Sequence, residues 1–153
     1  MHSSGFYRNN NEELCVQGIL VSDLAKKYGT PLFIYDSGLM KERYNVFLDT
    51  VANVKGNIHY AVKANDALAI VSYFTKLGCG ADIVSIGEFE KCVAAGMSPQ
   101  KIIFSGVGKK NSEIEVALKN KILQFNIESQ EELEDIYKVS SKLKMTANVC
   151  LRV

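Results

Sequence analysis

The sequence predicts an α/β fold: a partial (β/α)8 TIM-type barrel with about five of its eight strands, preceded by a strand of a second β domain. Three observations support this prediction. Short β-branched runs recur about 20 to 25 residues apart from residue 58 onward. A helical stretch follows each of the first four runs, and no glycine-rich turn follows the first run.

The β-branched runs predict parallel strands, because a helical crossover lies between each consecutive pair. They are Ile58–Ala64, Ala81–Ile86, Lys101–Ser105, Ile122–Ile127 and Thr146–Val153. A doubly wound open sheet usually carries a glycine-rich turn after its first strand. Here that place is taken by Lys63-Ala64-Asn65-Asp66. The sequence therefore favours a barrel over an open sheet.

The helices between these strands carry regular start and stop signals. In a capping box, a serine hydroxyl accepts a hydrogen bond from the third helical N–H and a glutamate reaches back to the serine N–H. Three such boxes predict helix starts: Ser85-x-x-Glu88, Ser112-x-x-Glu115 and Ser129-x-x-Glu132. Gly78 and Gly96 follow helical runs and suit the left-handed position at a helix end.

Residues 1–36 differ in character from the rest of the chain. Val21–Gly29 predicts a short helix, Pro31–Tyr35 predicts a strand of a second sheet, and Ser37 predicts the cap of a long helix. We expect residues 1–36 to be a segment of that second domain and residues 37–153 to be the N-terminal part of the barrel. Because a complete barrel needs eight strands, and an unpaired last strand would leave an open edge, we expect the chain to be a piece of a larger or split protein.

The composition is that of an ordinary globular protein. The 153 residues are 47% hydrophobic and carry a net charge of +1, so bulk charge gives no reason to expect a nucleic-acid or membrane partner. The polar opening Met1–Glu13 does not have the pattern of a signal peptide, and no apolar run is long enough to span a membrane. The four cysteines lie far apart with no C-x-x-C pair, so we expect no metal site and a reducing, cytoplasmic compartment.

Lys63 is the most informative single residue. If the strand Ile58–Ala64 alternates, then His59, Ala61 and Lys63 face the barrel interior, with Lys63 at the C-terminal end, where barrel enzymes place their sites. Position alone leaves two interpretations open: a solvated lysine at a strand end, or an amine that forms a Schiff base. His59 lies two layers deeper, and we assign it to core packing.

Two polar runs near strand ends carry weaker signals. Ser105–Lys110 contains glycines, but Ile103 stands where the first glycine of the phosphate-loop pattern G-x-x-x-x-G-K-[ST] belongs, so the run predicts a barrel loop. Glu128 and Ser129 follow a strand and could line a pocket. The capping box already accounts for Ser129, and we assign neither residue to the site.

The residues around Lys63 resemble a known family. Tyr60-Ala61-Val62-Lys63-Ala64-Asn65 is similar to the cofactor-lysine strand of the barrel-fold decarboxylases and alanine racemases that use pyridoxal 5'-phosphate (PLP). Further motifs in the same order narrow the resemblance to the bacterial diaminopimelate decarboxylases. They are Gly29–Tyr35, Gly80–Glu88 with Ala94-Ala95-Gly96, Ile102–Lys109, Asn126–Leu133 and Leu151-Arg152-Val153. The resemblance covers nearly the whole chain after about residue 17.

The resemblance implies a carbon–carbon lyase that converts meso-2,6-diaminopimelate to L-lysine and CO2, the last step of lysine biosynthesis. It implies that Lys63 is the catalytic lysine that binds PLP covalently, that Asp82 lies close to this lysine, and that Arg152 lies near the cofactor ring. We therefore predict these three as the cofactor-binding residues. From position alone, Asp82 is better explained as a turn or helix-entry residue. Arg152 is explained about as well as a salt-bridged barrel residue.

Other functions remain open. Ornithine, arginine and carboxynorspermidine decarboxylases share the lysine strand and the barrel, and so do non-catalytic PLP-binding barrel proteins, although these lack a leading strand such as Pro31–Tyr35. The resemblance also implies a small amino-acid substrate and a homodimer for the full-length protein. The family's phosphate-binding glycines, its acidic partner of the pyridine nitrogen and its second-subunit cysteine have no counterpart in this chain. We therefore expect this segment alone to bind PLP poorly and to catalyse little, and its open edge could drive self-association.

Overall fold

Two units make up the chain in the computed structural model, one of residues 1–56 and one of residues 57–153. The structure describes residues 5–54 and 56–153. The helix α2 (Ser37–Val51) falls in the first unit, whereas the sequence assigned it to the barrel. Each unit is described by itself below.

The first unit begins with a small antiparallel sheet that the sequence did not predict. Its strands β1 (Phe6–Arg8), β2 (Leu14–Val16) and β3 (Ile19–Leu20) pair in that order, and β3 runs directly into α1 (Val21–Tyr28). Gly29 ends α1 with φ 82°, a conformation that glycine adopts without strain. The predicted helix Val21–Gly29 is thereby confirmed to within one residue.

Two predictions for the first unit are wrong. Pro31–Tyr35 forms no strand: among the described residues no strand lies beside it to share hydrogen bonds, and Phe33 is 83% exposed. The cap of α2 is Asp36 rather than Ser37, since the Asp36 carboxylate accepts from the N–H of Leu39 at 3.1 Å. A carboxylate at that position also suits the positive end of the helix dipole.

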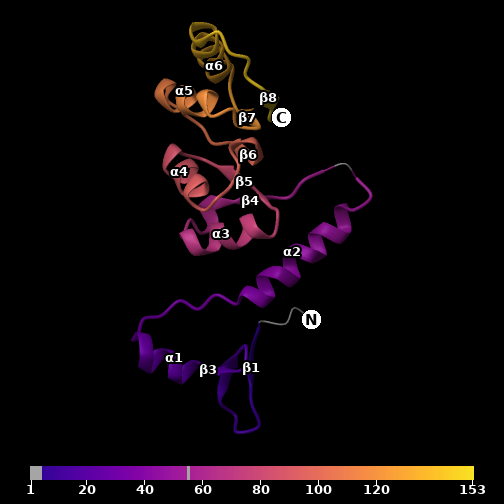
Figure 1. The fold of residues 1–153 in the computed structure, drawn as a ribbon, viewed down its shortest axis with the longest axis vertical. Helices are drawn as coiled ribbons and strands as arrows, with labels where there is room; N and C mark the ends of the chain where they lie inside the picture. The colour runs from indigo at the N-terminus through magenta and orange to yellow at the C-terminus, as the bar shows by residue number, and fades with distance from the viewer. Residues whose placement is uncertain (1–4, 55) are drawn as a thin grey trace. The chain divides into compact units, whose positions relative to one another are not determined.

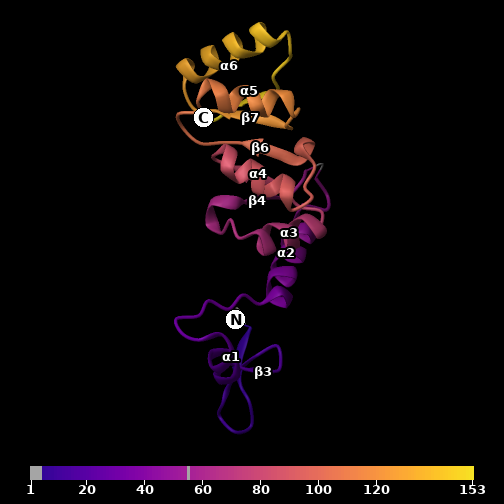
Figure 2. The ribbon, with the colours of Figure 1, turned by 60° about the vertical axis from the view of Figure 1, so that its left-hand side comes forward.

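The second unit is a five-stranded parallel sheet whose strands lie in chain order (Figures 1 and 2). The strands are β4 (His59–Ala61), β5 (Gly80–Ile83), β6 (Ile102–Phe104), β7 (Gln124–Ile127) and β8 (Val149–Leu151). The connecting helices are α3 (Leu68–Lys76), α4 (Ile86–Ala94), α5 (Asn111–Lys119) and α6 (Gln130–Leu143), with the short turns η1 (Val62–Ala64) and η2 (Pro99–Lys101).

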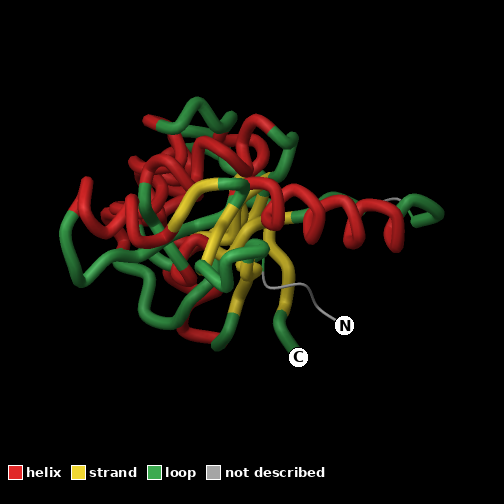
Figure 3. The backbone as a smooth tube through the Cα atoms, turned by 90° about the horizontal axis from the view of Figure 1, so that it is seen from below, coloured by secondary structure: helices red, strands yellow, loops and turns green. Residues whose placement is uncertain are grey.

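The strand order distinguishes a barrel from a doubly wound open sheet, the two folds considered from the sequence. A doubly wound sheet reverses its direction of growth at a switch point, whereas here each new strand is added on the same side of the last. In Figure 1 the helices α4, α5 and α6 lie to one side of the strands, as they do in the wall of a barrel. Figure 3 marks the strands in yellow and the helices in red. The predicted partial barrel is therefore confirmed. Within the described residues, no helix is long and apolar enough to cross a membrane.

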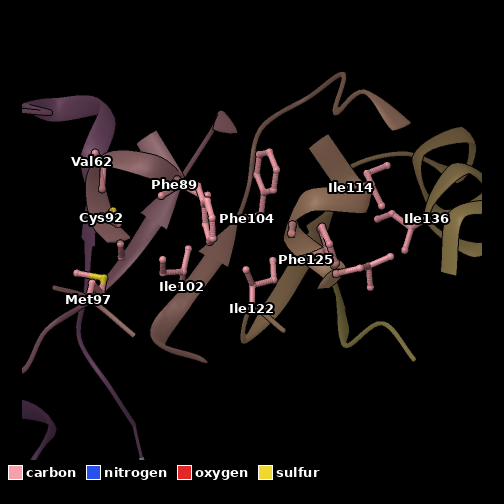
Figure 4. Close-up of a cluster of buried hydrophobic side chains, with 14 of the residues drawn as sticks. Val62, Phe89, Cys92, Met97, Ile102, Phe104, Ile114, Ile122, Phe125 and Ile136 are labelled. Atoms are coloured by element: carbon pink, nitrogen blue, oxygen red, sulfur yellow. The ribbon is translucent and has the colours of Figure 1, made fainter. Parts of the chain in front are cut away.

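The core of this unit lies between the sheet and its helices (Figure 4). Alternate strand residues point toward the helices and are at most 3% exposed: Ala81, Ile83, Ile102, Phe104, Phe125 and Ile127. The rings of Phe104 and Phe125 stack with centroids 6.1 Å apart. The residues between them in sequence, including Asp82 and Asn126, lie on the opposite face of the sheet and are half-buried. This opposite face corresponds to the barrel interior.

The capping boxes were predicted correctly for two helices and wrongly for one. The hydroxyls of Ser85 and Ser129 accept from the N–H groups of Glu88 and Glu132, both at 3.2 Å. Ser112 instead lies inside α5, which begins one residue earlier. There the Glu113 carboxylate accepts from the N–H of Lys110 at 3.0 Å and closes the helix start. The serine pattern was misleading because Glu113, two residues before Glu115, was available to accept at the helix start.

Removing a true cap and a misassigned one gives different results. Ser129→Ala is expected to lower the free energy of unfolding by about 1 kcal/mol, because the N–H of Glu132 loses its acceptor. Ser112→Ala is the matched control and is expected to leave stability nearly unchanged, since Ser112 is exposed within a helix. Urea unfolding of both variants measures the difference, and equal losses would contradict the cap assignment.

Two thiols in the second unit are expected to be inert. Burial raises the pKa of both Cys79 and Cys92 to about 11. At pH 8 they are therefore protonated, and the reactive thiolate is scarce. We expect iodoacetamide at pH 8 to alkylate the exposed Cys150 well before these two, with the difference abolished in urea and read by peptide mass analysis. Alkylation of Cys79 at the rate of Cys150 would contradict this burial.

Because of the same two thiols, the protein is expected to become less stable in alkali. Unfolded thiols ionise near pH 9.0, below the folded values of about 11. The contribution of these two thiols to the free energy of unfolding is therefore fully present below pH 9 and is lost as the pH rises toward 11.

Candidate functional site

A polar cavity of about 410 Å³ opens at the C-terminal ends of the parallel strands. It is lined by Lys63, Asp82, Val84, Ser105, Gly106, Val107, Asn126, Glu128 and Arg152. These residues come from the ends of all five strands or from the segments that follow them. The structure therefore brings together the three residues that the sequence singled out, and it does so at the end of the strands where barrels place their sites.

Lys63 reaches this cavity from a turn rather than from a strand. β4 ends at Ala61, and Lys63 is the middle residue of η1, so the predicted strand Ile58–Ala64 is too long at its end. The turn forms because Val62 is completely buried and its carbonyl accepts from the N–H of Asn65 at 3.0 Å. The strand alternation used to orient Lys63 thus does not extend to it, although the side chain still lines the predicted cavity.

The segment around Lys63 is anchored on both sides. The Tyr60 hydroxyl donates to the carbonyl of Asn65 at 3.0 Å, and the Tyr60 ring stacks on Phe74 with centroids 4.4 Å apart. On the far side, Asp66 forms an ion pair with Lys91 of α4. These contacts fix the backbone that carries the Lys63 amine, while the side chain itself is exposed.

Asp82 lies on the interior face of β5 and is held by a neighbouring strand. Its Oδ1 accepts a hydrogen bond from the hydroxyl of Ser105, which follows β6. The Ser105 hydroxyl in turn accepts from Nδ2 of Asn126 on β7 at 2.9 Å. Asp82 is thus part of a polar chain across the sheet, which the alternative of a simple turn residue does not describe.

Arg152 enters the cavity beside a carboxylate. Its Nη1 lies 3.2 Å from Oε1 of Glu128, and its side chain remains 68% exposed. The same Glu128 oxygen accepts from the N–H of Gly106 at 3.2 Å. Glu128 therefore joins the loop after β6 to the residue after β8, a role that the sequence interpretation did not assign to it.

Beneath the cavity lies a buried ion pair. Nζ of Lys109 is 2.8 Å from Oε1 of Glu132, and the two side chains are 1% and 7% exposed. The ammonium also donates to the carbonyls of Gly106 and Asn126, at 2.8 and 2.9 Å, while the second Glu132 oxygen accepts from the N–H of Glu128. One buried pair thus holds the backbone of three cavity-lining residues.

Four side chains that line or support the cavity were not assigned to the site from the sequence: Ser105, Lys109, Asn126 and Glu128. Lys109 was assigned to a loop because the glycines beside it draw attention to backbone freedom. The hint in the sequence was that Lys109 precedes the capping-box glutamate Glu132 by 23 positions. These two residues come together because β6 pairs with β7.

His59 lies outside this cavity. His59 lines a small cavity at the other end of the sheet, and its buried Nδ1 has no hydrogen-bond partner among the described residues. This position agrees with its expected distance from Lys63. No group of three or more metal-ligating side chains occurs within the part of the chain that the structure describes.

Comparisons with known proteins agree with this geometry. Residues 37–153 match the family model described as pyridoxal-dependent decarboxylase, pyridoxal binding domain. The diaminopimelate decarboxylases of Vibrio cholerae and Zymomonas mobilis are 40% and 43% identical to the chain over 97% and 94% of its length. The chain spans 36% and 35% of these two proteins, about a third of each.

Solved structures give the same result. The diaminopimelate decarboxylase of M. jannaschii in complex with L-lysine superposes with a TM-score of 0.92 at 32% identity, covering 99% of this chain and 36% of that one. Because the family model matches well over half of the residues, including all those that line the cavity, the chain belongs to the pyridoxal-dependent decarboxylase family.

Proposed function

We propose that this chain provides the lysine-bearing part of a PLP-dependent diaminopimelate decarboxylase, with Lys63 as the catalytic residue that binds the cofactor. The observation that carries the proposal is the meeting of Lys63, Asp82 and Arg152 in one cavity, in a chain whose family is defined by pyridoxal binding. The names of the relatives above supply diaminopimelate as the substrate. The resemblance found in the sequence implies the meso-2,6 isomer and the products L-lysine and CO2.

The cavity residues fit such a cofactor. An aldehyde needs an accessible primary amine, which Lys63 offers, and an anionic group is suited by the exposed guanidinium of Arg152. Val84 and Val107 add apolar surface for a planar ring. When bound, PLP provides an acceptor for the electrons that remain as the carboxylate leaves as CO2.

The chain's own residues have separable tasks in this proposal. Lys63 supplies the amine that binds the cofactor and gives way to the substrate amine. Asp82 supplies a fixed negative charge on the wall of the same cavity. Glu128 holds Arg152 at the rim through the 3.2 Å ion pair. The arrangement orients a charged ligand rather than merely enclosing it.

We extend the proposal to the domains of the protein, its oligomeric state, its location and its partners. We assign residues 1–36 to a second domain and residues 37–153 to the PLP-binding barrel, which the start of the family match at residue 37 supports. A homodimer and a cytoplasmic location are likewise proposed, with no nucleic-acid or membrane partner, in keeping with the near-neutral charge.

Substrate identity is tested by CO2 release. The polypeptide that carries this sequence, supplied with PLP, is assayed with meso-2,6-diaminopimelate, ornithine, arginine and carboxynorspermidine at equal concentration. Diaminopimelate is expected to be the preferred substrate by kcat/KM. Preference for one of the other three would keep the cofactor site and replace the substrate, whereas PLP binding with no turnover of any of them would support a non-catalytic protein.

A further inference from the structure

A directed chain of hydrogen bonds crosses three neighbouring strands behind the cavity. Nε2 of Gln124 donates to Oδ1 of Asn126 at 2.9 Å, and Nδ2 of Asn126 donates to the Ser105 hydroxyl at 2.9 Å. The Ser105 hydroxyl then donates to Oδ1 of Asp82. We propose that Ser105 and Asn126 are positioning residues for the Asp82 carboxylate, a role that rests on the proposed function of the cavity.

The direction of this chain follows from donor and acceptor capacity. The carbonyl oxygen of Asn126 is already occupied by Gln124, so its NH2 group faces Ser105. A serine hydroxyl has a single proton, and since it accepts from Asn126, that proton is directed to Asp82. Each member therefore determines the orientation of the next, and the carboxylate receives a donor of fixed direction.

Burial makes the chain rigid. Ser105 is 8% exposed, and a hydrogen bond in such an environment is less easily exchanged for one to water. The backbone beneath it is fixed by Lys109, whose ammonium binds the carbonyls of Gly106 and Asn126. The two positioning side chains thus stand on segments held together by one buried cation.

The consequence for the site is electrostatic. Asp82 and Lys63 line the same cavity, and the hydrogen-bonded chain fixes where the Asp82 carboxylate stands on its wall. A carboxylate that turns away acts less on charged groups in the cavity, because electrostatic interactions weaken with distance and with access of water. The other charged groups at the cavity or beside its walls form pairs or caps of their own: Glu128 with Arg152, Asp66 with Lys91, Lys109 with Glu132, and Glu88 with the N–H of Val84.

The first test needs no cofactor. In the full chain, side-chain NMR resonances of the Asn126 amide and the Asp82 carboxyl carbon are compared between the unaltered protein and Ser105→Ala. Both resonances are expected to shift, while Ser105→Thr, which keeps the hydroxyl, restores them and Ser112→Ala leaves them unchanged. Unchanged resonances in Ser105→Ala would overturn the proposal whether or not PLP binds.

The second test measures how fast Lys63 forms a borohydride-trappable adduct with PLP as the pH is varied. Because both changes act on the same carboxylate, Ser105→Ala and Asp82→Asn are each expected to change the pH profile of this rate in the same direction relative to the unaltered protein. The double variant is expected to move it no further, since both changes remove one effect. Additive shifts, or a shift in Asp82→Asn alone, would overturn the positioning role.

The two tests distinguish failure of the proposed function from failure of the positioning role. Absence of any adduct on Lys63 in the unaltered protein refutes the proposed function, while the NMR arm still decides whether Ser105 and Asn126 hold Asp82. If Ser105→Ala does not fold, Ser105→Cys replaces it, because a thiol of similar size is a weak donor and is expected to give the same changes in reduced degree.

Discussion

Replacement of Lys63 by alanine is expected to abolish borohydride-stable attachment of PLP and to lower the decarboxylation rate by on the order of 10⁴-fold, as loss of a covalent nucleophile does. The reason is chemical: the aldehyde has no other amine among the residues that line the cavity. The measurement is reduction of the PLP-treated protein, followed by proteolysis and mass analysis of the peptide that contains residue 63.

Two controls accompany this variant. Lys76→Ala removes an exposed lysine of α3 outside the cavity and is expected to leave both attachment and rate unchanged. Lys63→Arg keeps a positive charge in the cavity but offers no primary amine, so it is expected to behave like Lys63→Ala. A pyridoxyl group found on a lysine other than Lys63 in the unaltered protein would remove the central assignment.

Breaking the buried ion pair is expected to cause the largest loss of stability. Glu132→Leu leaves the ammonium of Lys109 buried without its counter-ion and should lower the free energy of unfolding by about 3–5 kcal/mol. Urea unfolding measures the loss. The exposed pair Lys138–Asp135 provides the matched control, since Lys138→Ala removes an ion pair that is largely solvated and should have almost no effect.

A double variant separates the charge from the packing. In Lys109→Met with Glu132→Leu no charge remains buried, so the loss is expected to be smaller than the sum of the two single losses. It should not vanish, because the carbonyls of Gly106 and Asn126 lose their donor. A single-variant loss no greater than that of Lys138→Ala would show that the pair contributes little to holding the loop after β6.

Much of the fold could be predicted because its signals are local. The five strand positions of the second unit follow from β-branched runs, and the caps at Ser85 and Ser129 follow from residues three positions apart. Lys63 was found through its immediate neighbours in sequence. Two predictions were wrong because a local pattern is not sufficient by itself. Pro31–Tyr35 has no partner strand in the part of the chain that the structure describes, and Glu113 takes the capping role predicted for Ser112.

For the second unit, the sequence alone determined the order of strands and helices, the apolar face that packs under the helices, and the residue that offers an amine just after the first strand. Only the tertiary structure decided which polar side chains meet. Ser105 lies 23 positions from Asp82 and 21 from Asn126, and Lys109 lies 23 from Glu132. Such contacts depend on the register of adjacent parallel strands, in which a shift of one residue would turn each side chain to the other face of the sheet.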